Sequence, residues 1–225
     1  MNLKEYNVKV RDAVRPLMSL TRRIAGSLTR QDAGQRAPTG PTGPTGPTAS
    51  SIRVLTAAVP VSMLVPNDMT GAVAEVLSGE YESGFSGSGL TVLDIGANVG
   101  SFAIWAGMRW PQSTVHCYEP HPGTFRLLEQ NTSDRSGVIR HNVAVFPTEG
   151  RRLPLFQRYD GDGESGLAHV MSHYFNEGVG STVEVDLVHP SELPSADVVK
   201  IDVEGVEAAI LEHLEIINGA GYEHR

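Results

Sequence analysis

The fold of this chain is decided by the stretch TVLDIGANVG, residues 91–100. A mostly apolar segment of strand length, residues 90–95, runs directly into a glycine-rich turn and then into residues 99–108, whose apolar side chains recur with helical spacing. Gly96 and Gly100 allow a tight turn and a close approach of a ligand to the backbone. Such a strand, turn and helix form the opening unit of a parallel α/β sheet.

Similar units follow along the chain and predict its architecture. Strands are expected at residues 114–119, 138–146 and 198–202, and helices at residues 70–77, 122–131 and 206–214. Short apolar strands that alternate with amphipathic helices favour a parallel sheet with right-handed crossovers. We therefore expect a Rossmann-like α/β domain.

Two segments of the domain depart from this alternation. Residues 52–55 and 61–65 flank Pro60 and predict either a hairpin or two edge strands. Between residues 151 and 193 the pattern weakens into polar, glycine-rich sequence. We interpret this second segment as an insertion or a substrate loop.

The first 50 residues differ from the rest and form a tail. Residues 3–28 place side chains alternately four and three apart in a heptad rhythm, which Pro16 interrupts. This pattern favours either an oligomerising helix or a frayed amphipathic tail. Three Gly-Pro-Thr triplets at residues 40–48 predict a disordered, semi-extended linker. We therefore divide the chain into a tail at residues 1–50 and a domain at residues 51–225.

Composition and charge exclude several classes of protein. The net charge is −8, of which residues 1–50 contribute +5 and the remaining residues −13, and an acidic body argues against a nucleic-acid partner. No apolar run is long enough for a transmembrane segment. The single cysteine, Cys117, excludes an internal disulfide and fits a reducing, cytoplasmic location.

The chemistry of the turn indicates which ligand it suits. Asp94 directly precedes the turn, where its charge repels phosphate, and the spacing does not match the G-x-G-x-x-G fingerprint of nicotinamide oxidoreductases. A carboxylate here suits the ammonium group of an amino-acid ligand, and the turn amides suit its carboxylate. S-adenosyl-L-methionine carries both groups and a sulfonium.

A second acid lies at the end of the next expected strand. Glu119 follows Gly100 by nineteen residues, and an acid at about this spacing holds the ribose hydroxyls in nucleotide-binding sheets. The alternative is a surface carboxylate at a strand end.

Four stretches of the chain resemble the FkbM family of class I methyltransferases. They are LDIGANVGSF at residues 93–102, YEPHP at 118–122, NVAV at 142–145 and KIDVEGVE at 200–207. The likeness covers roughly residues 60–215. It implies a methyl transfer that depends on S-adenosyl-L-methionine, usually onto a hydroxyl of a sugar, polyketide or similar small or glycan-like acceptor.

The resemblance also implies which residues bind the cofactor. It places the methionine part against the turn, the ribose at Glu119 and the adenine near the end of the third strand. The residues expected to bind the cofactor are Asp94, Gly96, Ala97, Asn98, Gly100, Glu119, Pro120, Asn142 and Ala144. His121, which follows Pro120, is expected at the cofactor edge.

Two acids are candidates for the catalytic chemistry. Asp202 and Glu204 follow the strand at residues 198–202, which neighbours the first strand in this type of sheet, so their carboxylates should face the ligand crevice. Either one orients or deprotonates the acceptor. Alternatively, Asp202 contacts cofactor or backbone and Glu204 favours the helix dipole. A carboxylate metal site is a further alternative, and no residue is assigned as a metal ligand.

The end of the sequence departs from the family pattern. A class I sheet normally has seven strands, whereas only residues 215–225 follow the last expected helix. The predicted sheet is therefore truncated at its C-terminus, and its fourth strand lies at or near an apolar edge. Association through this edge or through the N-terminal helix is one expectation. An inactive remnant or assembly subunit is the alternative function.

Overall fold

The computed structural model describes seven parts of the chain. They are residues 49–55, 60–66, 69–82, 84–157, 166–167, 181–203 and 206–214. The chain divides into two units, Met1–Gln35 and Arg36–Arg225, and every described residue belongs to the second. The predicted N-terminal helix and the Gly-Pro-Thr linker lie outside the described residues.

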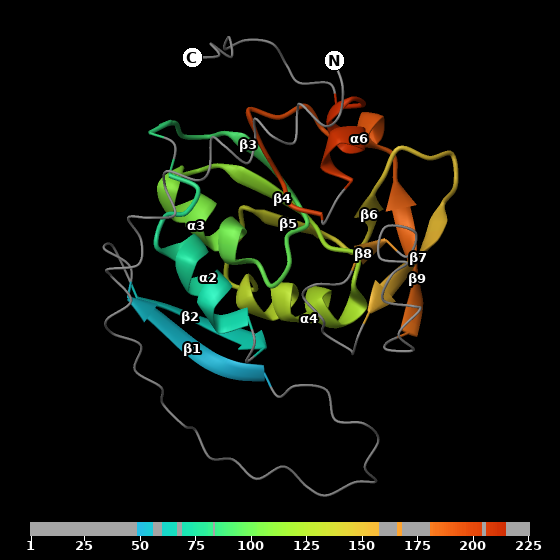
Figure 1. The fold of residues 1–225 in the computed structure, drawn as a ribbon. Coiled ribbons are helices and arrows are strands. Elements are labelled where there is room, and N and C mark those ends of the chain that lie inside the picture. Colours follow the sequence, from blue (N-terminus) through green and yellow to red (C-terminus); the bar gives the residue numbers. More distant parts are fainter. Residues whose placement is uncertain are drawn as a thin grey trace, which may run out of the picture. The chain divides into compact units, whose positions relative to one another are not determined.

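A four-stranded parallel sheet forms the centre of the domain (Figure 1). Its strands, in spatial order, are β10 (Val198–Ile201), β3 (Thr91–Ile95), β4 (Thr114–Tyr118) and β5 (Val138–His141). The sheet confirms the predicted Rossmann-like α/β fold. As predicted, the strand after the insertion pairs with the first strand, and within the described residues it lies at an edge of the sheet.

Four helices of the described residues accompany the sheet. They are α2 (Thr70–Leu77), α3 (Ser101–Arg109), α4 (Pro122–Asn131) and α6 (Glu207–Leu211). The bounds of α2 and α4 agree with the sequence prediction, whereas α6 is shorter than the predicted helix at residues 206–214. In the part of the chain that is described, no helix is both long enough and apolar enough to cross a membrane.

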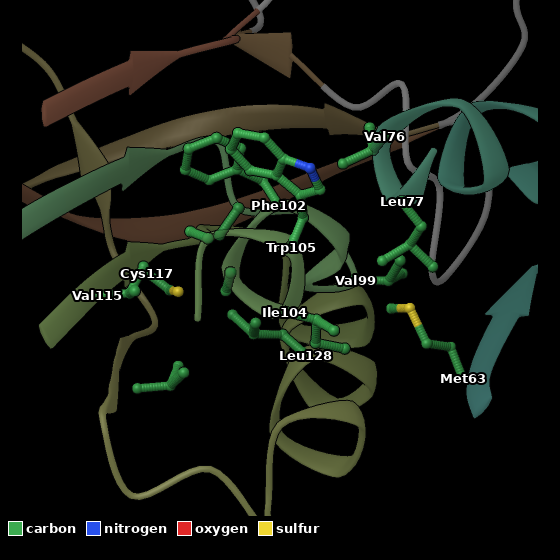
Figure 2. Packing of buried hydrophobic residues seen from close by; sticks show 14 of the residues in the cluster. Met63, Val76, Leu77, Val99, Phe102, Ile104, Trp105, Val115, Cys117 and Leu128 are labelled. Atoms are coloured by element: carbon green, nitrogen blue, oxygen red, sulfur yellow. The ribbon is translucent and has the colours of Figure 1, made fainter. Parts of the chain in front are cut away.

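The side chains of the sheet alternate between two hydrophobic cores, as expected for strands that are covered on both faces. Val92, Val115 and Cys117 belong to the first core, which α2, α3 and α4 complete with residues such as Phe102 and Leu128 (Figure 2). Leu93, Ile95 and Tyr118 belong to the second core, which contains side chains from α6 and from a smaller sheet.

An antiparallel hairpin packs against the first core. Strands β1 (Ala49–Leu55) and β2 (Pro60–Pro66) pair along their whole length, which resolves the choice between a hairpin and separate edge strands. Val61, Met63 and Val65 of β2 are buried, with exposed residues between them. This period of two is the reason that the sequence pattern identified the strand.

A second sheet occupies the region that the sequence left as an insertion. It contains β6 (Ala144–Val145), β9 (Ser181–Val188), β7 (Arg152–Gln157) and β8 (Gly166–Leu167), in this spatial order. The strand predicted at residues 138–146 is confirmed at Val138–His141 but is not continuous, because the chain leaves the central sheet after His141 and enters the smaller one at Ala144. The sequence analysis missed β7 because Pro154 interrupts its apolar pattern, and it overlooked β9, in which Val183, Val185 and Leu187 alternate with polar residues.

Leu128 offers a test of the first core. It is fully buried on α4, whereas its neighbour Glu129 is exposed. We expect Leu128→Ala to lower the free energy of unfolding by about 2–5 kcal/mol, because the substitution leaves a cavity. Glu129→Ala should change it by less than about 0.5 kcal/mol. Urea denaturation measures both, and equal losses would contradict this packing.

Candidate active site

The turn between β3 and α3 is built around two glycines with left-handed backbone angles. Gly96 has a φ of 78° and Gly100 a φ of 91°. A Cβ atom at Gly96 would lie 2.0 Å from the backbone oxygen of Asp202, and one at Gly100 would lie 2.8 Å from a methyl group of Leu128. Both glycines are therefore required by the packing of the protein on itself, because the end of β10 and helix α4 approach the turn closely.

The N–H groups of the turn are already donated within the protein. Those of Gly96 and Ala97 both donate to the carbonyl oxygen of Tyr118 at 3.0 Å, and that of Gly100 donates to the Ala97 oxygen at 2.9 Å. The N–H of Asn98 donates to Oε2 of Glu119 at 2.9 Å. The sequence analysis expected turn amides to receive a ligand carboxylate, whereas these four groups have partners in the chain itself.

Glu119 is buried at the point where β4 ends. Its Oε1 accepts the N–H of His121 and its Oε2 the N–H of Asn98, both at 2.9 Å. Burial raises the pKa of Glu119 to about 7, although the two backbone hydrogen bonds favour the charged form. A carboxylate offers about four acceptor positions, so these two bonds leave capacity for further donors.

Asp94 forms a buried ion pair with Lys200. The two residues lie opposite each other on β3 and β10, and Nζ of Lys200 is 3.1 Å from Oδ1 of Asp94. The same ammonium donates to the carbonyl oxygen of Gly96 at 2.6 Å and lies 3.8 Å from Oδ2 of Asp202. Burial lowers the pKa of Lys200, but the two carboxylates raise it by more, so the side chain remains charged.

The ion pair belongs to a polar row that crosses the central sheet. Lys200, Asp94, Cys117 and Arg140 are register partners on β10, β3, β4 and β5. The thiol of Cys117 points to Oδ2 of Asp94 at 3.9 Å, and burial raises its pKa well above the usual value. Cys117 is thus a protonated core residue. Arg140 donates to the side chain and the carbonyl of Thr132.

The residues expected near the adenine separate into two groups. Asn142 lies beside the loop after β4, where its amide donates to the carbonyl oxygens of Glu119 at 2.8 Å and Pro120 at 3.1 Å. Ala144 instead lies in β6 of the smaller sheet, buried in the second core. The structure therefore brings Asn142, but not Ala144, into contact with the loop that carries Glu119.

Asp202, one of the two catalytic candidates, directly follows β10. The side chain of Asp202 is 60% exposed, whereas Glu204 lies outside the described residues. Tyr81 also belongs to this region, although the sequence analysis did not identify it. Burial raises its pKa to about 12, and its side chain interacts electrostatically with Lys200 and Asp202. Its ring meets that of Phe102 edge to face at 5.0 Å. Among the residues that are described, no group of three or more His, Cys, Asp or Glu side chains is arranged to hold a metal ion.

His121 lies inside the protein and caps helix α4. It is fully buried, and its Nδ1 accepts the N–H of Thr124 at 3.2 Å. This bond leaves the proton on Nε2, which donates to the amide oxygen of Gln157 at the end of β7. Gln157 in turn donates to Ser181, the first residue of β9, at 3.1 Å. His121 therefore links the loop after β4 to the smaller sheet.

Lys200 and Tyr81 are the site residues that sequence reasoning missed. Lys200 stands two positions before Asp202, but its contact with Asp94 depends on the register of β10 against β3. Tyr81 follows α2 in a segment without a recognisable pattern. Nothing in the local sequence indicated that Lys200 contacts the turn or that Tyr81 interacts with Lys200.

Gly96→Ala tests the close approach of the turn to β10. The added methyl group would collide with the backbone at Asp202, and the alanine would have to adopt the positive φ of this position. We therefore expect a loss of at least about 2 kcal/mol in the free energy of unfolding. The matched control is Gly107→Ala on helix α3, where no atom lies within 4 Å of the added Cβ. It should stabilise the protein by up to about 1 kcal/mol. Denaturation curves of the two variants that coincide would contradict this packing.

Glu119→Gln tests the buried acid. The pKa of Glu119 in the folded protein, about 7, exceeds the usual glutamate pKa of 4.5, so the folded state binds the proton more tightly. The resulting stability is fully present below pH 4.5 and is lost as the pH rises through 7, by roughly 3 kcal/mol. We expect Glu119→Gln to remove this decline when the free energy of unfolding is measured from pH 4.5 to 8. An unchanged decline would show that another group causes it.

Comparisons with known proteins find similarity to methyltransferases. No protein-family model matches it. Methyltransferase 1 of Beauveria bassiana is 26% identical over 157 residues, which cover 59% of this chain and 63% of that protein. The 31-O-demethyl-FK506 methyltransferase FkbM of Streptomyces tacrolimicus is 41% identical over 56 residues, 25% of this chain and 19% of that protein. Hexuronic acid methyltransferase AglP of Haloferax volcanii is 28% identical over 131 residues, 53% of this chain and 47% of that protein.

The match to these relatives is partial. The chain spans less than two thirds of the length of each of these three proteins. Among solved structures, methyltransferase FkbM from Methylobacillus flagellatus KT aligns with a TM-score of 0.40 and 14% identity, over 61% of this chain and 32% of that one. The curated relatives confirm the resemblance to the FkbM family of methyltransferases that the four sequence stretches predicted.

Proposed function

We propose that the chain is an S-adenosyl-L-methionine-dependent methyltransferase that acts on a hydroxyl of a sugar, polyketide or similar small molecule. The observation that carries the proposal is the position of Glu119. Its buried carboxylate is attached to the turn after β3 through the N–H of Asn98. This places the acid that suits a ribose directly beside the turn that suits an amino-acid ligand.

The polar groups around the turn fit this cofactor better than a dinucleotide. Carboxylates stand at Asp94, Glu119 and Asp202, while the N–H groups of residues 96–98 and 100 are donated internally. A pyrophosphate needs free N–H donors, which these four N–H groups do not offer. The sulfonium, the ammonium and the two ribose hydroxyls of the proposed cofactor need acceptors and negative charge, which Glu119 and Asp202 offer, whereas its carboxylate needs donors other than these four N–H groups. This donor set argues against a nicotinamide oxidoreductase.

We assign a role in cofactor binding to Glu119, Asn142 and the turn. Glu119 accepts hydrogen bonds from the ribose hydroxyls with the acceptor positions that its backbone bonds leave. Asn142 holds the loop of Glu119 and Pro120 in place through its two carbonyl contacts. The backbone of Gly96, Ala97 and Asn98 lies against the methionine part of the cofactor.

The chemical step follows from the cofactor that we propose. Bound S-adenosyl-L-methionine supplies a methyl group on a sulfonium, and its transfer joins the methyl carbon to the acceptor oxygen, breaks the carbon–sulfur bond to leave a thioether and releases the hydroxyl proton. Positioning supplies much of the catalysis of such an in-line displacement. Asp202 is exposed beside the turn, and we propose that it, or Glu204, orients the acceptor or takes the proton.

The names of the relatives support the class of acceptor. One acts on 31-O-demethyl-FK506 and another on hexuronic acid. The first name indicates methylation of an oxygen, and the second indicates a sugar acid as the acceptor. A cytoplasmic location is part of the same proposal and rests on the single cysteine. Association through residues 1–30 or through the edge at β10 stays a prediction.

Calorimetric titration with S-adenosylhomocysteine tests the cofactor site. We expect micromolar binding by the full chain, a loss of at least tenfold in affinity for Glu119→Gln, and no change for Glu129→Gln on the exposed side of α4. NAD serves as the control ligand and should not bind. Folded protein that gives no heat with S-adenosylhomocysteine would overturn the proposal.

Turnover separates an enzyme from an inactive relative. The chain is incubated with S-adenosyl-L-methionine and either a hexuronic acid or a macrolide alcohol, and S-adenosylhomocysteine is quantified. Release above the rate without acceptor is the expected result. Binding without release for any acceptor in a panel of such alcohols would favour the non-catalytic alternative.

A further inference from the structure

Lys200 is a buried cation to which the proposed chemistry gives no role. Its side chain is 9% exposed, and its ammonium lies near three oxygens, those of Asp94, Gly96 and Asp202. Burial of a charge is strongly unfavourable unless partners compensate for it. One of these partners is the carbonyl of the turn itself, so the cation acts on the backbone of the proposed cofactor site.

Two contacts hold the peptide group between Gly96 and Ala97 from opposite sides. Its N–H donates to the carbonyl oxygen of Tyr118 at 3.0 Å, and its C=O accepts from Nζ of Lys200 at 2.6 Å. A hydrogen bond from a charged donor is about twice as strong as a neutral one. Lys200 therefore fixes the direction of this carbonyl in a turn where the positive φ of Gly96 is otherwise easily changed.

Asp94 is inaccessible to a ligand in this arrangement. Its side chain is 0% exposed, and its carboxylate is occupied by Lys200 and faced by the thiol of Cys117. Of the two carboxylates beside Lys200, that of Asp202 is exposed. A ligand at the turn meets the Gly96 carbonyl and Asp202 directly, whereas it meets Asp94 only through Lys200.

We propose that Lys200 is a positioning residue that fixes the Gly96 carbonyl for the amino-acid end of the cofactor, and that Asp94 acts through Lys200 rather than by contact with the cofactor. The inference rests on the proposed function and adds to it the end of the cofactor that is affected. The groups that face Lys200 are Asp94, Asp202, Tyr81, Glu80 and the ring of Phe102 at 5.9 Å. Among these residues, Lys200 carries the positive charge.

Two ligands distinguish positioning from a general structural role. S-adenosylhomocysteine carries the amino-acid end, and 5′-methylthioadenosine lacks it but keeps the ribose and adenine. We expect Lys200→Met to weaken binding of the first at least tenfold and binding of the second less than threefold. A merely structural role would weaken both ligands equally, and that result would overturn the proposal.

A double-mutant cycle tests whether Asp94 acts through Lys200. We expect Asp94→Asn to weaken S-adenosylhomocysteine binding, and the double variant Asp94→Asn/Lys200→Met to bind it no more weakly than Lys200→Met alone. Losses that multiply in the double variant would mean that Asp94 contacts the ligand independently. That outcome would overturn the second half of the proposal.

The cycle remains informative if one variant does not fold. Lys200→Met leaves Asp94 buried without its partner, which is strongly destabilising, whereas the double variant removes both charges. The double variant is then compared directly with the unsubstituted chain, and we expect the same selective loss of S-adenosylhomocysteine. Unchanged affinity for that ligand would overturn the proposal.

A matched control removes an ion pair elsewhere. Arg152 and Asp186 form an exposed pair at 2.9 Å between β7 and β9, and Arg152→Met/Asp186→Asn should leave both affinities unchanged. Failure of the unsubstituted chain to bind S-adenosylhomocysteine would overturn the proposed function and this role with it. Binding by the unsubstituted chain with parallel losses for the two ligands would overturn this role alone.

Discussion

Asp94 and Lys200 lie opposite each other on adjacent parallel strands, and their ion pair is buried beneath the turn that follows β3. The two opposite charges compensate each other in the interior. The ammonium of Lys200 also donates a hydrogen bond to the carbonyl oxygen of Gly96 in the turn. The end of β4 holds the same turn through Tyr118 and Glu119. Three strands thus converge on one short segment of backbone and hold it through contacts within the chain itself.

The sequence predicted the parts of the fold that depend on local pattern. The bounds of α4 were predictable because Pro122 marks its first turn, and β3 was predictable because an apolar run meets Gly96. The smaller sheet was not predictable, because β6 has two residues and β7 contains Pro154. Such strands are stabilised by their pairing with β9, which no local pattern indicates.

The candidate site also has features that the sequence predicted and features that it did not. The position of Glu119 followed from its spacing after Gly100, since strand ends in a parallel sheet meet at one edge. Its bond to Asn98 did not follow, and neither did the pairing of Asp94 with Lys200, because both depend on three-dimensional register. Sequence reasoning therefore assigned Asp94 to a ligand's charge, whereas in this structure the chain's own cation occupies that carboxylate.

The hydrogen bond between Gln157 and Ser181 has a consequence for how this scaffold can diversify. The two residues are register partners where β7 ends and β9 begins, and Gln157 is anchored to the fully buried His121. The end of β7 and the start of β9 are therefore held together. Loop-closure entropy grows slowly with length, so a change in length outside β8, which itself pairs with β7, adds little to the free-energy cost of closing this segment. Grafting the corresponding segment of a relative between these two residues would leave the turn after β3 untouched.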